Sequence, residues 1–137
     1  LEAIISRACF IPRDFVFKKA AYTEVGGYNF SLPIYEDWDL KIRLAARYPF
    51  HYSGLNGIGY RRHGHGLSAA PLTEHLKIME KIFNQHIDLV PKNKRREVKE
   101  KFILHQQKIR AEIERNKLGQ KTLSMPAEST GGKKSSR

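Results

Sequence analysis

Cysteines, long apolar runs and a secretory signal are rare or absent in this sequence of 137 residues, and each absence excludes a class of protein. It contains one cysteine, Cys9, which excludes an internal disulfide and fits a reducing compartment. No apolar run approaches the roughly 20 residues that a membrane-spanning helix needs, so a soluble protein is expected. The first residues do not combine a basic stretch with an apolar one, so no secretory signal is visible.

Methionine is also scarce: only Met79 and Met125 occur, and the chain opens on Leu1. We therefore expect the chain to be a piece of a longer protein, so that its function depends on further residues. The length allows one domain with a hydrophobic core, but not two ordinary ones. A hydrophobic content of 40% lies in the globular range.

Acidic residues are fewer than basic ones, and the excess of basic residues lies mostly in the last third of the chain. The net charge is +11. Residues 1–91 hold 11 Lys/Arg and 9 Asp/Glu, a net charge of +2, whereas residues 92–137 hold 14 and 5, a net charge of +9. The part with a predicted core is therefore nearly balanced, and we expect no nucleic-acid partner. Phe102 is the only aromatic residue in the basic part, so stacking on single strands is not indicated.

Apolar patterning and turn residues predict a mixed α/β chain. Short strands are expected at residues 3–5, 8–11, 14–17, 50–54 and 58–63. Helices are expected at residues 18–25, 36–48, 71–90 and 94–118. Gly26 and Gly27 suit the left-handed backbone that ends the first helix, and Gly119 follows the last. The Ser-, Gly- and Lys-rich segment 119–137 should be disordered.

Two of these helices have a predicted buried face. In the helix at 36–48, Trp38, Ile42 and Ala45 fall at i, i+4 and i+7, and Leu40 and Leu44 widen this stripe. The buried face of the helix at 71–90 is expected to comprise Leu76, Met79, Ile82 and Phe83.

Three acids, Glu36, Asp37 and Asp39, open the helix at 36–48, and they have two interpretations. Carboxylates in a first helical turn face unpaired N–H groups and the positive end of the macrodipole, which stabilises a helix by ~0.3–1 kcal/mol each. Asp39 could also pair with Arg43 on the exposed side of the helix. Alternatively, a carboxylate fixed and ionised at this position suits a general base. The spacing alone slightly favours the first interpretation.

Three motifs taken together favour the second interpretation. A Val-Gly-Gly-Tyr-Asn turn at 25–29 precedes the Glu-Asp-Trp-Asp-Leu helix start at 36–40, and Tyr-Arg-Arg-His follows at 60–63. In this order and spacing, residues 5–83 resemble the acceptor-side half of family 2 glycosyltransferases, which are inverting enzymes of the GT-A fold. The resemblance implies a nucleotide-sugar donor and a saccharide or lipid-linked acceptor, as in polysaccharide biosynthesis.

The resemblance also assigns roles to individual residues. Asp37 corresponds to the proposed base that deprotonates the acceptor hydroxyl, and Glu36 would line the acceptor site or orient the base. Trp38, Gly26 and Gly27 are expected at the substrate-binding site, with Trp38 on the buried face as an anchor.

Arg61 and His63 fall on the last of the three motifs. The Arg61 guanidinium could bind the leaving diphosphate, because its planar fork matches phosphate oxygens; alternatively, it is a structural ion-pair partner. His63 is a candidate metal ligand, and a hydrogen-bonded histidine at the end of a strand is an equally good interpretation. His63 and His65 lack further ligands at suitable spacing, so a dedicated zinc site is not expected. Cys9 is expected to be a small core residue.

The donor-binding half of such an enzyme would precede these motifs and carry the Asp-x-Asp that holds Mg²⁺ or Mn²⁺. No Asp-x-Asp precedes the helix at 36–48. The expected fold class is therefore α/β, a partial GT-A fold that lacks its N-terminal nucleotide-binding half and is inactive alone. The expected division is an acceptor-side part at 1–90, a basic helix at 91–118 and a disordered tail at 119–137.

A non-catalytic binding module is the alternative function. The basic helix at 91–118 could contact an anionic membrane or a partner protein. Glutamates interrupt its charge and its apolar stripe is thin, which favours a solvated helix packed on the domain. The expected location is cytoplasmic, at the inner face of the membrane if the acceptor is lipid-linked.

Overall fold

The computed structural model of the chain describes residues 1–7, 15–55 and 70–123, and the regular structure in these ranges is entirely helical. The α-helices are α1 (Glu2–Ser6), α2 (Lys19–Glu24), α3 (Glu36–Ala45), α4 (Leu72–His86) and α5 (Arg95–Leu123). Two short 3₁₀-helices, η2 (Ile87–Leu89) and η3 (Lys92–Lys94), connect α4 to α5.

This architecture overturns the predicted α/β class and, with it, the partial GT-A fold. Residues 3–5, expected as a strand, lie in α1, while 15–17 and 50–54 have no regular structure. A short apolar run fits a buried helix as well as a strand, and periodicity cannot separate the two. The strands expected at 8–11 and 58–63 lie outside the described residues. Sequence features attributed to a glycosyltransferase therefore have no support from the fold.

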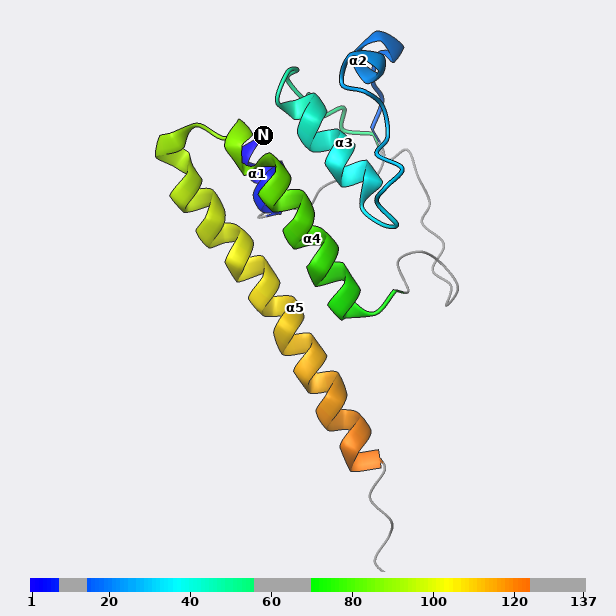
Figure 1. Ribbon diagram of the computed structural model, residues 1–137, viewed down its shortest axis with the longest axis vertical. Helices are drawn as coiled ribbons and strands as arrows, with labels where there is room; N and C mark the ends of the chain where they lie inside the picture. The colour runs from blue at the N-terminus through cyan, green and yellow to red at the C-terminus, as the bar shows by residue number, and fades with distance from the viewer. Residues whose placement is uncertain (8–14, 56–69, 124–137) are drawn as a thin grey trace, which may run out of the picture.

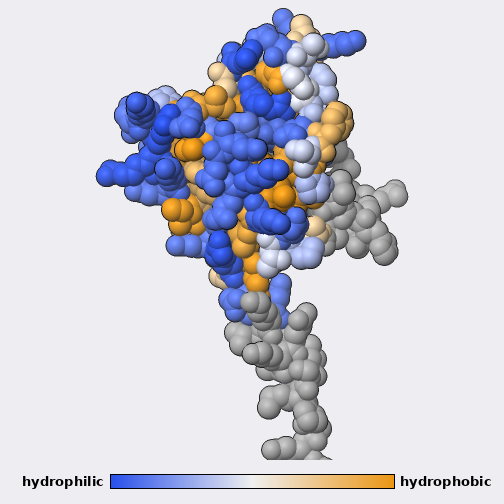
Figure 2. All heavy atoms as spheres, viewed as in Figure 1, coloured by the Kyte–Doolittle hydropathy of each residue, from blue (hydrophilic) through white to orange (hydrophobic). Residues whose placement is uncertain are grey.

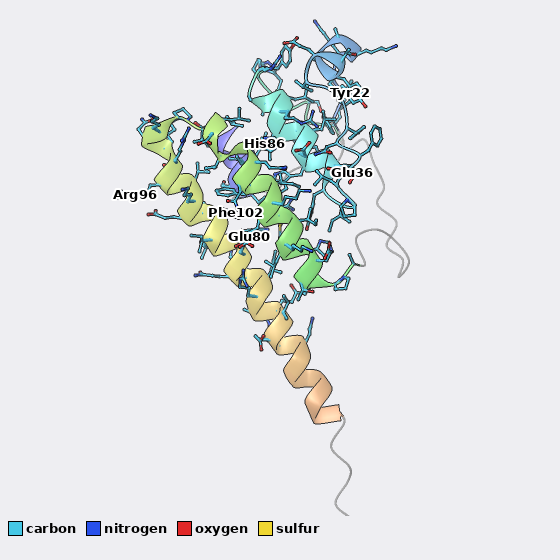
Figure 3. All side chains as sticks on the ribbon, viewed as in Figure 1. Tyr22, Glu36, Glu80, His86, Arg96 and Phe102 are labelled. Atoms are coloured by element: carbon cyan, nitrogen blue, oxygen red, sulfur yellow. The ribbon has the colours of Figure 1, made fainter. Side chains whose placement is uncertain are left out.

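The antiparallel helices α4 and α5 form one side of the molecule (Figure 1). The predicted face of α4 is confirmed, because Leu76, Met79, Ile82 and Phe83 are all buried. Phe102 of α5 stacks on Phe83, with ring centroids 4.0 Å apart. Figure 3 shows Phe102 directed toward α4 and Arg96 on the opposite side of α5, so only one stripe of this helix contributes to the core.

The five-residue helix α1 lies against α3, α4 and α5. Ile5 is fully buried among them. The indole Nε1 of Trp38 donates a hydrogen bond to the Ile4 carbonyl at 2.8 Å, which fixes α1 to α3. Lys94 also pairs with Glu2 at 3.0 Å. Segments far apart in the sequence thus meet at the start of the chain.

Helix α2 ends as predicted at the glycine pair, where Gly26 and Gly27 have φ values of +83° and +68°. The end of α5 differs from the prediction, because the helix continues through Gly119 to Leu123. One glycine in a helix costs only about 1 kcal/mol relative to alanine, which is too little to stop a long helix. On the face seen in Figure 2, hydrophilic residues cover most of the surface of the described chain. None of the described helices is both long and apolar enough to cross a bilayer.

Candidate functional site

The three acids at the start of α3 lie in two different environments. Glu36 and Asp37 are partly exposed at the end of the helix, whereas the side chain of Asp39 is only 2% exposed. Tyr35 precedes the helix in a left-handed conformation (φ +66°) and provides no side-chain cap. The first-turn carboxylates therefore supply the negative charge that favours the helix N-terminus. Figure 3 shows Glu36 at this end of α3.

Asp37 presents a carboxylate that a substrate could reach. Its side chain is 40% exposed, and its Oδ2 accepts a hydrogen bond from Lys41 Nζ at 3.0 Å. Lys41 is itself 2% exposed, with its ammonium 4.6 Å from the centre of the Phe15 ring. A buried ammonium needs an anionic partner, so Asp37 is a counter-ion as well as a candidate base. The geometry is compatible with both roles.

Asp39 is the centre of a buried network that the sequence only partly predicts. Its Oδ2 accepts hydrogen bonds from Arg43 Nε and Nη2 at 2.9 and 2.6 Å, and its Oδ1 lies 2.6 Å from His86 Nε2. The predicted Asp39–Arg43 pair is thus confirmed, but its expected place on the exposed side of α3 is wrong. Burial raises the pKa of Asp39, and the hydrogen bonds from His86 and Arg43 outweigh that effect and hold the pKa below its ordinary value.

Arg43 also links α3 to the glycine turn. Its Nη1 donates to the Val25 carbonyl at 2.5 Å, and its Nη2 donates to the Gly27 carbonyl at 2.7 Å. These carbonyls follow the end of α2, where helical partners are missing. A Cβ at Gly27 would lie 2.9 Å from the Tyr22 ring, so this glycine also permits a close approach. Gly26, in contrast, has no atom within 4 Å of an added Cβ.

A cavity of about 460 Å³ lies between the glycine turn, α3 and the end of α4. Its lining is Gly26, Gly27, Tyr28, Asn29, Phe30, Asp39, Arg43, Gln85 and His86. The structure therefore brings the two glycines predicted to bind substrate together with the Asp39 network. Glu36 and Asp37 do not line this cavity.

The remaining predicted site residues lie apart from the cavity or outside the described ranges. Trp38 is 1% exposed, and its ring packs against Tyr35 and under the Arg7 guanidinium, so its predicted place on the buried face of α3 is confirmed. Its predicted contact with substrate stays untested. Arg61 and His63 lie outside the described residues.

Metal binding finds no support in residues 1–7, 15–55 and 70–123, where no group of three or more His, Cys, Asp or Glu side chains could hold an ion. The predicted Mg²⁺ or Mn²⁺ was expected mainly in a preceding half of the enzyme, and its candidate ligand here, His63, lies outside the described residues, so this expectation stays a prediction.

His86 is the residue that sequence reasoning missed. It is 47 residues from Asp39 in the sequence, and no local motif predicts the contact between the two side chains. The only available signal is its position in the last turn of α4, where a histidine is favoured by the helix dipole.

Comparison with known proteins adds no further assignment: no family model, curated protein or solved structure matches the chain.

Proposed function

We propose that Asp37 is the general base in an inverting glycosyl transfer from a nucleotide-diphosphate sugar to an acceptor hydroxyl. The observation that carries this proposal is an exposed carboxylate held at the start of α3 by a buried lysine. The hydrogen bond from Lys41 Nζ, at 3.0 Å, holds this carboxylate in a position that an acceptor hydroxyl can reach. The helical fold contributes nothing to this proposal, which depends on the motifs and on the geometry of the site.

In the proposed reaction, the acceptor hydroxyl donates its proton to the Asp37 carboxylate. The hydroxyl oxygen forms a bond to the anomeric carbon, and the bond from that carbon to the diphosphate breaks on the opposite side. The diphosphate leaves with the electron pair. Glu36, the neighbouring partly exposed carboxylate, would orient the acceptor.

The donor would be bound by a further part of the enzyme, so the proposed activity requires that part. The described residues offer no donor set for Mg²⁺ or Mn²⁺.

The test is the rate of sugar transfer by the whole enzyme that contains this chain, measured with a panel of nucleotide-diphosphate sugars. Asp37→Asn should lower the rate by about 10²–10⁴-fold, the usual contribution of a general base. Asp88→Asn is the matched control, because Asp88 is an exposed carboxylate that also has one basic partner, Arg95. A near-normal rate for Asp37→Asn would contradict the proposal.

A second comparison separates the base from the counter-ion. The double variant that combines Asp37→Asn with Lys41→Met removes both charges of the pair, so its stability and its transfer rate are each compared with those of Asp37→Asn alone. If Asp37 is the base, transfer stays slow in the double variant. Recovery of the rate together with stability would show that Asp37 acts only as the partner of Lys41.

A binding surface on α5 is the second candidate function, favoured by the exposure of Ile103 and Leu104 on this basic helix. Part of its charge is paired locally, since Lys101 contacts Glu97 at 2.5 Å. Binding to vesicles that contain phosphatidylserine, weakened when Ile103 and Leu104 are both replaced by serine, would support this candidate. Equal binding by both proteins would remove it.

A further inference from the structure

A row of aromatic side chains connects the glycine turn to the residue that holds the candidate base. Tyr28, in the turn, packs edge-on against Tyr22 of α2, with ring centroids 5.6 Å apart. Tyr22 stacks on Phe17 at 5.6 Å, and Phe17 contacts Phe15 at 5.1 Å. The row ends at Lys41 of α3, whose ammonium lies 4.6 Å from the centre of the Phe15 ring. These four rings, here called the aromatic row, therefore reach from the turn after α2 to α3.

The turn end of the aromatic row is fixed by polar contacts and by close packing. The Tyr22 hydroxyl accepts a hydrogen bond from the backbone N–H of Tyr28 at 3.2 Å. A Cβ at Gly27 would lie 2.9 Å from the Tyr22 ring, so the turn passes directly over this ring. Arg43 Nη2 donates to the Gly27 carbonyl at 2.7 Å. The turn thus contacts α3 directly through Arg43 and a second time through the aromatic row.

The other end of the row lies in residues 15–17, which have no regular structure. Phe15 and Phe17 are half-buried, whereas Val16 between them is fully exposed. This alternation indicates that the two rings point to one side of the segment and Val16 to the other. Contacts with Tyr22 and Lys41, and not a helix or strand, therefore hold the two rings in place.

Lys41 connects the aromatic row to Asp37. Its side chain is 2% exposed, and its Nζ donates to Asp37 Oδ2 at 3.0 Å. A cation within about 6 Å of a ring centre is attracted to the face of the ring, and the attraction is stronger when the cation is desolvated. The Phe15 ring thus favours one position of the ammonium, and the hydrogen bond passes this position on to the half-exposed carboxylate of Asp37.

We propose that Phe15, supported by Phe17, is a positioning residue for Asp37 and acts through the Lys41 ammonium. This role rests on the proposed function, in which Asp37 accepts the proton of the acceptor hydroxyl. A general base must lie within hydrogen-bond reach of the proton that it takes, so a small displacement of its carboxylate slows the chemical step. Because Phe15 acts on the base and not on a substrate, its loss should lower kcat and leave KM unchanged.

The first test is the transfer assay on the whole enzyme that contains this chain. Phe15→Leu keeps an apolar side chain but removes the ring, and it should lower kcat about tenfold, the scale of one cation–π contact to a buried ammonium. Phe15→Tyr keeps a ring and should retain the wild-type kcat. Val16→Ala is the matched control from the same segment, because the Val16 side chain is fully exposed, and it should change neither kcat nor KM.

A double variant separates positioning of the base from a general loss of structure. If Phe15 acts through Asp37, adding Phe15→Leu to Asp37→Asn should lower the rate no further, because no base is left to position. A further tenfold loss in the double variant would overturn the proposal. A loss in Phe15→Leu that Phe15→Tyr shares would also overturn it, since the ring would then not be the group that matters.

NMR of the full chain tests the contact itself without an activity assay. The Phe15 ring current should move the signals of the protons next to Lys41 Nζ upfield of those of Lys77, an exposed lysine on α4. Equal signals for the two lysines in the wild-type chain would overturn the proposal, even if Phe15→Leu does not fold.

These outcomes are distinguishable from failure of the proposed function. Slow transfer by Asp37→Asn together with a normal kcat for Phe15→Leu would leave the base and overturn the positioning role. Near-normal transfer by Asp37→Asn would remove the base, and with it the role of Phe15, even where the Lys41 signals are shifted.

Discussion

Replacing Asp39 with asparagine tests whether the buried network holds α3, α4 and the glycine turn together. The amide introduced by Asp39→Asn would keep one acceptor oxygen but leave the Arg43 guanidinium without its anionic partner in a largely buried position. Removing one partner of a buried pair typically costs about 3–5 kcal/mol. For a domain of this size, that corresponds to a decrease in the unfolding midpoint of about 10–20 °C.

The assay is unfolding in urea followed by the helical circular dichroism signal, with the slope m compared to confirm the same cooperative transition. Asp88→Asn is again the control, and it should change the free energy of unfolding little because the Asp88 side chain is 82% exposed. A loss below about 1 kcal/mol for Asp39→Asn would refute the reasoning, since that is the scale of an exposed ion pair.

The stability lost in Asp39→Asn should also depend on pH. The pKa of Asp39 lies below its ordinary value of 3.8, because hydrogen bonds from His86 and Arg43 outweigh the effect of burial. Its ionisation therefore contributes stability that is fully present above pH 3.8 and is lost as the pH falls through the lower folded-state pKa. The stability difference between the wild type and Asp39→Asn should shrink below about pH 3.8. A difference that is constant across this range would contradict the assignment.

Two further predictions concern stability, measured by thermal unfolding. Gly27→Ala should lower the free energy of unfolding by about 1–3 kcal/mol, because a left-handed residue is strained and its Cβ would lie 2.9 Å from Tyr22. Gly26→Ala should lower it by less, since only the backbone strain applies there. Equal losses for the two variants would contradict the role of Tyr22. Phe102→Ala removes a buried, stacked ring and should lower the free energy of unfolding by about 3–5 kcal/mol. Ile103→Ala, on the exposed side of α5, should change it little. Similar losses for the two variants would refute the assigned buried face of α5.

Helical periodicity predicted well where a segment is long and its apolar residues recur on one face. The buried side of α4 and the positions of Trp38 and Ile42 on α3 agree with the structure, because a repeat near 3.6 residues can be read from the chain alone. The glycine pair was equally informative. Few residues other than glycine adopt two consecutive positive φ values, so the end of α2 follows from the sequence.

Short apolar segments were the main source of error. The run at 3–5 is part of a helix, of which Ile5 is buried because it packs against α3 and α5, a contact that depends on residues far along the chain. Asp39 shows the same limitation within the site. Its i, i+4 partner Arg43 is a local contact and was predictable, whereas its burial depends on His86, which comes from a separate helix.

The position of α1 has a consequence for how the chain folds during synthesis. Helix α1, the first described helix to leave the ribosome, is covered by α5, which is the last described helix to leave it. Ile5 and the carbonyl that receives the Trp38 hydrogen bond therefore lack part of their final surroundings until nearly the whole described chain has emerged. A nascent chain that ends before α5 would expose this apolar segment, so the native state should become protease-resistant only after α5 is translated.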